Sequence, residues 1–200
     1  HRNIGMTHLM ADNLPSAKEY LQEAIRLSES LGARTNYVKA VLSLADTNRK
    51  LGLLDDAQKG YEVALSESRL RGIREVEWRS LQGQALVALE RNDRPAAIDL
   101  LNQAISLVEQ MRASIRVEEL QDGFLADKQG LYEQMILLLL DEGRTEDSFE
   151  YAERARARNF IDLLGNQRIS LNNAADQSLI ERDRELHSRI ARLEADLGSV

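Results

Sequence analysis

Histidine is the residue of this chain best suited to metal binding or to general acid–base chemistry near neutral pH, and it occurs as His1, His8 and His187. None of the three has a second histidine at the spacing of a metal site, and there are no cysteines. Zinc-like sites, disulfides and cysteine-based catalysis are therefore excluded by composition. We expect His8 to pack in a core or line a groove, and His187 to lie on a solvated helix face.

Acidic pairs could in principle serve general acid–base catalysis, but their positions indicate a structural role. Asp55–Asp56 and Glu118–Glu119 fall where helices are expected to begin, and the helix dipole stabilises negative charge there. The sequence contains no phosphate-binding loop, dinucleotide fingerprint or nucleophile elbow. We therefore expect no enzymatic activity, no cofactor and no bound metal, although an unrecognised site between helices stays open as an alternative.

The densest basic cluster is formed by Arg154, Arg156 and Arg158. Glu150 and Glu153 lie at helical spacing from these arginines, so surface ion pairs along one helix are favoured over an anion-binding site.

Composition favours a helical protein. The chain has 200 residues, of which 43% are hydrophobic and only 4% aromatic, so a sizeable core can form and general disorder is unexpected. A net charge of −7 argues against a nucleic-acid surface. The longest apolar run, 135–140, is far shorter than the roughly 18 residues of a membrane span. No signal peptide is visible, and the cytoplasm is favoured over export.

A small–large–small pattern recurs every 40 residues. Its members have spacings of four and three, which places them on one helical stripe. The three copies are Ala17-Leu21-Ala24, Ala57-Tyr61-Ala64 and Ala97-Leu101-Ala104. Pro15 and Pro95 lie in the expected first turns of two of these helices, and Gly32 and Gly72 follow two of them as helix-ending residues.

A second helical pattern precedes each copy. It is clearest at Val41, Leu44, Ala45 and Asn48 and at Trp78, Leu81, Ala85 and Ala88, with a shorter version around Ile4, Gly5 and His8. The residues of both patterns resemble the tetratricopeptide (TPR) repeat over about 1–165, although the usual TPR repeat has 34 residues. The resemblance implies an all-α fold, a right-handed superhelical α-solenoid of antiparallel helix pairs.

A fourth unit follows at an altered spacing. Ser148, Ala152 and Ala155 repeat the pattern 51 residues after the third copy, and the 11 extra residues correspond to about three helical turns. We expect a long helix near 116–141 and its partner near 145–164. The residues expected to point inward from the first are Leu131, Met135, Ile136, Leu139 and Leu140.

The predicted units are 1–33, 34–73, 74–114 and 115–165, followed by a linker at 166–175 and an amphipathic helix at 176–200. That last helix either packs on its own chain or mediates self-association, because Leu179, Leu186, Ile190 and Leu193 have a heptad-like spacing.

The TPR resemblance also implies a site. In TPR arrays the first helix of each pair lines a concave groove that binds a peptide or a segment of a partner protein. The residues implied to line it here are Lys39, Leu42, Asp46, Arg49, Lys50, Arg79, Gln82, Leu86, Leu89, Glu133, Leu137 and Leu140. Such a groove would suit an extended or helical peptide with apolar anchors and some acidic groups. A purely architectural, self-associating array is the alternative.

One stretch resembles a narrower family. Phe124-Leu-Ala-Asp-Lys128, Leu137-Leu-Leu-Leu-Asp-Glu-Gly-Arg144 and Ser148-Phe-Glu-Tyr-Ala-Glu-Arg-Ala-Arg-Ala-Arg158 look like the segment before a CHAT domain in bacterial TPR–CHAT proteins. CHAT domains are caspase-like cysteine peptidases. The catalytic residues of that family fall beyond this segment, so none can be assigned here. The resemblance implies that the array senses a partner and regulates a peptidase.

Overall fold

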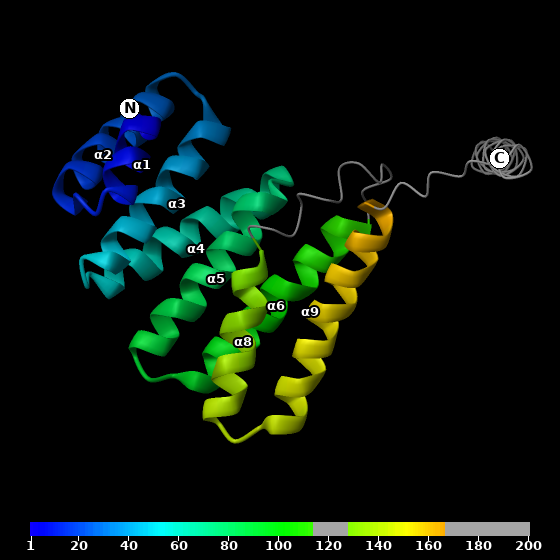
Figure 1. Cartoon of the computed structure of the whole chain (residues 1–200). Coiled ribbons are helices and arrows are strands. Elements are labelled where there is room, and N and C mark those ends of the chain that lie inside the picture. Colours follow the sequence, from blue (N-terminus) through cyan, green and yellow to red (C-terminus); the bar gives the residue numbers. More distant parts are fainter. Residues whose placement is uncertain (114–127, 167–200) are drawn as a thin grey trace, which may run out of the picture. The chain divides into compact units, whose positions relative to one another are not determined.

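The computed structural model describes residues 1–113 and 128–166, and every regular element in these ranges is an α-helix (Figure 1). The chain divides into two units, residues 1–164 and 165–200. The helices are α1 (Arg2–Met10), α2 (Leu14–Ser30), α3 (Arg34–Lys50), α4 (Leu54–Arg71), α5 (Arg74–Glu90), α6 (Arg94–Ala113), α8 (Gln129–Asp141) and α9 (Thr145–Asn166).

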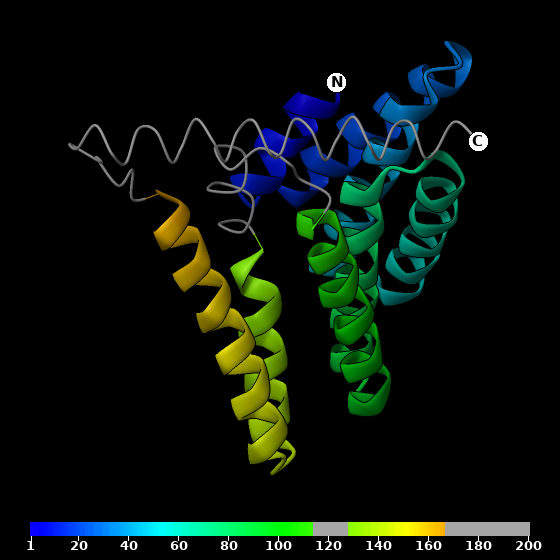
Figure 2. The ribbon, with the colours of Figure 1, turned by 90° about the vertical axis from the view of Figure 1, so that its right-hand side faces the viewer.

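Each of the helices α1 to α5 packs against the next one in the chain, and α8 packs on α6. α8 and α9 form a helical hairpin, seen in Figures 1 and 2, in which the Ser148 hydroxyl donates a hydrogen bond to the Ile136 carbonyl at 3.3 Å. In addition, α3 contacts α5 directly, so first helices of successive pairs adjoin. This stacking of helix pairs is the predicted TPR-like solenoid.

Left-handed residues separate the helices, and from Asp12 to Asn92 they recur every 20 residues. Positive φ values between 58° and 74° occur at Asp12, Gly32, Gly52, Gly72, Asn92 and Gly143. Gly32 and Gly72 end their helices as predicted. Asp12 and Asn92 take the same conformation because Asp and Asn tolerate it better than other residues that carry a Cβ.

The residues of the recurring pattern form the contacts between helices. Ala57, Ala97 and Ala104 are fully buried, as the periodicity predicts, and so are Leu21 and Tyr61. Small side chains at these positions allow close helix approach.

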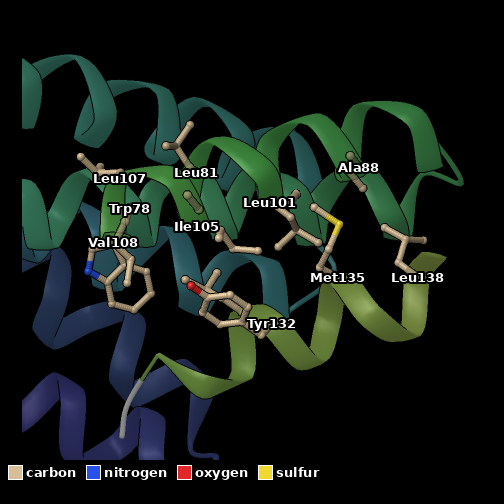
Figure 3. Packing of buried hydrophobic residues seen from close by; sticks show 14 of the residues in the cluster. Trp78, Leu81, Ala88, Leu101, Ile105, Leu107, Val108, Tyr132, Met135 and Leu138 are labelled. Carbon is tan, nitrogen blue, oxygen red and sulfur yellow. The ribbon is translucent and has the colours of Figure 1, made fainter. Parts of the chain in front are cut away.

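The core forms two clusters. One joins α3, α4 and α5, and the other joins α5, α6 and α8 and is partly covered by α9. Figure 3 shows the second cluster, where Met135 and Tyr132 of α8 lie beside Leu101 and Ile105 of α6.

The first helix of the fourth unit follows the prediction in part. Leu131, Met135 and Leu139 are buried and Ile136 is partly buried, but the inward position predicted for Leu140 is wrong, since Leu140 is 47% exposed. Leu138 is buried instead, because the apolar stripe of α8 runs through 131, 135 and 138–139 and residue 140 lies about 100° further round the helix.

The other predictions for the C-terminal part fall mostly outside the described residues. The predicted start of this helix near 116 lies there, and so do residues 167–200. Asn166, expected as the first linker residue, is the last residue of α9.

Candidate functional site

The first-helix face comprises the side chains of α3, α5 and α8 that the repeat pattern predicts to line a groove. Most of those on α3 and α5 are partly buried, because α3 contacts α5 along the array. Hydrogen bonds and ion pairs cross from one first helix to the next.

An ionic network joins α3, α4 and α5. The Tyr61 hydroxyl on α4 donates to Oδ1 of Asp46 on α3 at 2.8 Å, and Nη2 of Arg79 on α5 lies 4.0 Å from Asp46 Oδ2. One turn further along α3, Nη1 of Arg49 donates to Glu90 Oε1 of α5 at 2.6 Å. Three predicted site residues, Asp46, Arg49 and Arg79, therefore have partners within the protein.

Burial controls the protonation of the two central groups of this network. Burial raises the pKa of Asp46, and the opposing effects of the Tyr61 hydrogen bond and of the Arg79 charge do not fully offset it. Burial also raises the pKa of Tyr61, with a further contribution from the Asp46 charge. Tyr61 is thus a neutral hydrogen-bond donor that positions Asp46 on the first-helix face.

Polar contacts also join α5 to α8. The Gln82 amide donates to Gln134 Oε1 at 3.1 Å. Nearer the start of both helices, Nε1 of Trp78 donates to Glu75 Oε2 at 2.9 Å, and Nζ of the buried Lys128 lies 3.9 Å from the same oxygen. The Lys128 ammonium also lies 5.4 Å from the centre of the Trp78 ring, within range of a cation–π interaction.

Sequence reasoning missed Gln134, Glu75 and Lys128 as members of this surface. Gln134 corresponds to Gly83 in the third unit, which gives no sign of a polar contact there, and the pairing of Glu75 with Lys128 joins residues 53 positions apart. The sequence shows only that Glu75 and Trp78 lie three residues apart, and so one turn apart on the same helix.

Other predicted residues of the site have different surroundings. Leu42 is only 4% exposed and packs in the core cluster of α3 to α5, which corrects its assignment to an accessible surface. Its position on α3 faces the helix interface, because α4 and α5 both pack against this helix. Lys39 is partly exposed and has no ion-pair partner among the described residues. The exposed Lys50 lies 3.5 Å from Asp12.

The remaining predicted residues are less exposed on α5 than on α8. Leu86 and Leu89 are partly buried, and Leu89 packs against the core. Glu133, Leu137 and Leu140 are exposed on α8.

The residues considered for chemistry have structural contacts. The His8 ring stacks on Tyr20 with 5.3 Å between ring centres. Asp55 and Asp56 lie in the first turn of α4, as expected. His187 and Glu118–Glu119 lie outside the described residues.

The arginines of the basic cluster on α9 form ion pairs both within α9 and with α6. Arg156 pairs with Glu153 at 3.5 Å, as expected, but Arg154 donates to Glu109 of α6 at 3.0 Å and lies 4.7 Å from the Tyr151 ring centre. These contacts hold α9 on α6. The side chain of Arg158 is not among those described.

Within residues 1–113 and 128–166, no group of three or more His, Cys, Asp or Glu side chains is arranged to hold a metal ion. No helix in these ranges is both long enough and apolar enough to cross a membrane.

No known protein family matches the sequence, and no curated protein matches it. Solved structures do resemble the fold. The Rap conjugation gene regulator of the plasmid pLS20, solved in complex with the Phr* peptide, matches with a TM-score of 0.64 and 16% identity over 96% of this chain. The match covers 53% of the regulator, so this chain spans about half its length. MamA matches at a TM-score of 0.38 and 16% identity, over 86% of this chain and 95% of MamA.

Proposed function

We propose that this protein is a scaffold that binds an extended or helical segment of a partner protein in a groove along the first-helix face. The observation that carries the proposal is the direct contact of the first helices α3 and α5, across which Asp46 pairs with Arg79 and Arg49 with Glu90. The similarity in fold to a regulator solved with a bound peptide supports it. We infer a binding role without catalysis.

The contacts within the face favour binding of a segment with an acidic group. Lys39 is the available cation, since it lacks an ion-pair partner among the described residues, whereas Arg49 has a short contact with Glu90. Arg79 lies 4.0 Å from Asp46 and is therefore held less closely than Arg49, whose guanidinium lies 2.6 Å from Glu90. Charges of this kind speed association and set specificity, while desolvated aliphatic side chains such as Leu86 supply much of the affinity.

Charge reversal at Lys39 tests the proposal more cleanly than reversal at Arg49 or Arg79, whose partners within the protein would be left unpaired. A partner would first be captured from the native source and its affinity measured by calorimetry. We expect Lys39→Glu to weaken binding roughly tenfold, about 1.4 kcal/mol. Circular dichroism would confirm that the variant is folded.

Lys59→Glu is the matched control, because Lys59 is exposed on the second helix α4 and also lacks an ion-pair partner among the described residues. The affinity of the Lys59→Glu variant for the partner should equal that of the wild type. A partner that is insensitive to Lys39→Glu but sensitive to Lys59→Glu would show that the second helices carry the binding surface.

We further propose that the array is the sensor part of a TPR–CHAT protein, on the strength of the resemblance over Phe124–Leu164. The gene sequence that follows the codon for Val200 tests this directly. A histidine and a later cysteine in caspase-like strand–loop contexts would support it, and an unrelated sequence there would refute it. Self-association through 176–200 is the alternative role, and sedimentation of the chain with and without these residues would detect it.

A further inference from the structure

Three large apolar side chains are exposed together on the α8–α9 hairpin, the last helix pair in the described part of the chain. Leu137 and Leu140 on α8 are 63% and 47% exposed, and Phe149 on α9 is 66% exposed. Exposed apolar residues scattered singly need no explanation, but a group of them on adjoining helices marks an interaction site. We call these three residues the stacking face.

The repeat explains why these positions are apolar. The third unit has equivalent residues 51 positions earlier, namely Leu86, Leu89 and Ile98. Leu89 and Ile98 are partly buried and pack against the core cluster to which α8 contributes. Ile98 also shares a pocket with Leu139 of α8 and Tyr151 of α9. In the third unit, therefore, Ile98 faces the helix pair that follows, and Leu89 packs against a cluster that this pair helps to form.

The stacking face occupies the corresponding positions of the fourth unit. No described residue covers these positions as fully as the fourth unit covers those of the third. Because the corresponding positions of the third unit pack against a helix pair, we expect a helix to fit the stacking face. A helix that lies where the first helix of a further unit would lie can place an aliphatic stripe on Leu137, Leu140 and Phe149.

Charge around the stacking face narrows the chemistry of that helix. Glu133 lies one turn before Leu137 on α8, and Glu146 lies one turn before Phe149 on α9. Both carboxylates are exposed and have no ion-pair partner among the described residues. A second copy of this chain would bring acidic rims together, which is unfavourable. A helix with lysine or arginine beside its apolar stripe would be complementary.

We propose that the stacking face binds an amphipathic helix of a partner protein, with an aliphatic stripe flanked by basic residues. The stacking face shares Leu137 and Leu140 with the α8 part of the first-helix face, but it extends onto α9 and includes no residue of α3 or α5. The inference does not depend on the proposed function, because it rests on the exposed apolar side chains of the last described helix pair. It would let the array hold one partner along α3 and α5 and a second on the α8–α9 hairpin.

Two synthetic helical peptides test the proposal on the full chain. Both carry the same leucine stripe, and they differ only in having lysine and arginine or glutamate beside it. Fluorescence anisotropy should show binding of the basic peptide and at least tenfold weaker binding of the acidic one. Equal affinity for the two peptides, or no binding of the basic one, would overturn the proposal.

Variants locate the peptide. Leu137→Ser combined with Phe149→Ser should weaken binding of the basic peptide at least tenfold, whereas Leu70→Ser, at a leucine 76% exposed on α4, should leave it unchanged. Lys39→Glu should also leave it unchanged, which distinguishes this site from the part of the first-helix face on α3. Unaltered affinity of the double variant would overturn the assignment. So would a dimer, seen in sedimentation, that the double variant dissociates, because a second copy would then cover the face.

Discussion

Asp46 links α3 to both neighbouring helices of its network, α4 and α5. Its carboxylate accepts a hydrogen bond from Tyr61 and lies beside Arg79, yet burial still raises its pKa. The folded protein therefore holds the Asp46 proton more tightly than the unfolded chain does. Ionising Asp46 in the folded state costs stability, and that cost is present at neutral pH.

Replacing Asp46 with asparagine removes this titration while keeping an oxygen that can accept from Tyr61. Because the folded pKa is raised, the stability of the wild type should fall relative to Asp46→Asn as the pH rises from the unfolded value near 3.8 through the folded pKa. Urea unfolding of both proteins between pH 4 and pH 7 measures the difference. A wild type that gains stability relative to the variant over this range would show that the charges of Arg79, Arg49 and Lys50 outweigh burial.

The sequence predicts which residues lie on first helices but not how they pair. Asp46, Arg49 and Arg79 were predicted for the binding surface from repeat position alone, and they lie on α3 and α5 as expected. Their pairing depends on the crossing of α3 and α5 and on side-chain rotamers, since Arg49 reaches a residue 41 positions away. The periodicity of a sequence predicts neither the helix crossing nor the side-chain rotamers. Leu42 was misplaced for the same reason, because its burial depends on how closely neighbouring helices pack.

At the scale of elements, the turns and the small residues made the helices predictable. From Asp12 to Asn92 a left-handed residue every 20 positions fixes helix length, and fully buried alanines fix the packed stripe of the second helices α4 and α6. The fourth unit was harder to predict, because α8 contains four consecutive leucines at 137–140. A run that is apolar on all sides does not reveal which residues face inward, so Leu140 was misassigned.

Enlarging a fully buried alanine tests the packed stripe. Ala97 of α6 lies in the core cluster with Leu101 and Trp78, so Ala97→Leu should overpack this contact and lower the free energy of unfolding by roughly 1–3 kcal/mol. Thermal and urea unfolding measure it. Gln110→Leu is the control, at an exposed site on the same helix, and should change stability little. Equal stability of Ala97→Leu and the wild type would contradict the assigned register.

At the scale of the whole molecule, residues 1–164 are stabilised mainly by contacts between neighbouring helices. The two core clusters both include α5, with Val76 and Val87 in one and Trp78 and Leu81 in the other. Among the described residues, neither cluster contains buried side chains from both α3 and α8, and neither includes a buried residue of α2. In such an array, stability is close to a sum of unit stabilities and interface energies.

This local coupling predicts that a core mutation loosens one region and spares distant ones. Met135→Ala removes a fully buried side chain of α8 and should cost roughly 2–5 kcal/mol. Native-state hydrogen exchange should then show faster exchange in α8 and in the part of α6 that it contacts, while α2 and α3 keep their protection. Leu21→Ala, equally buried in α2, should give the reverse pattern. If Met135→Ala instead lowered protection equally from α2 to α8, the units would unfold as one cooperative body. A loss of stability at α8 lowers the protection of α2 only when every interface between these helices opens together.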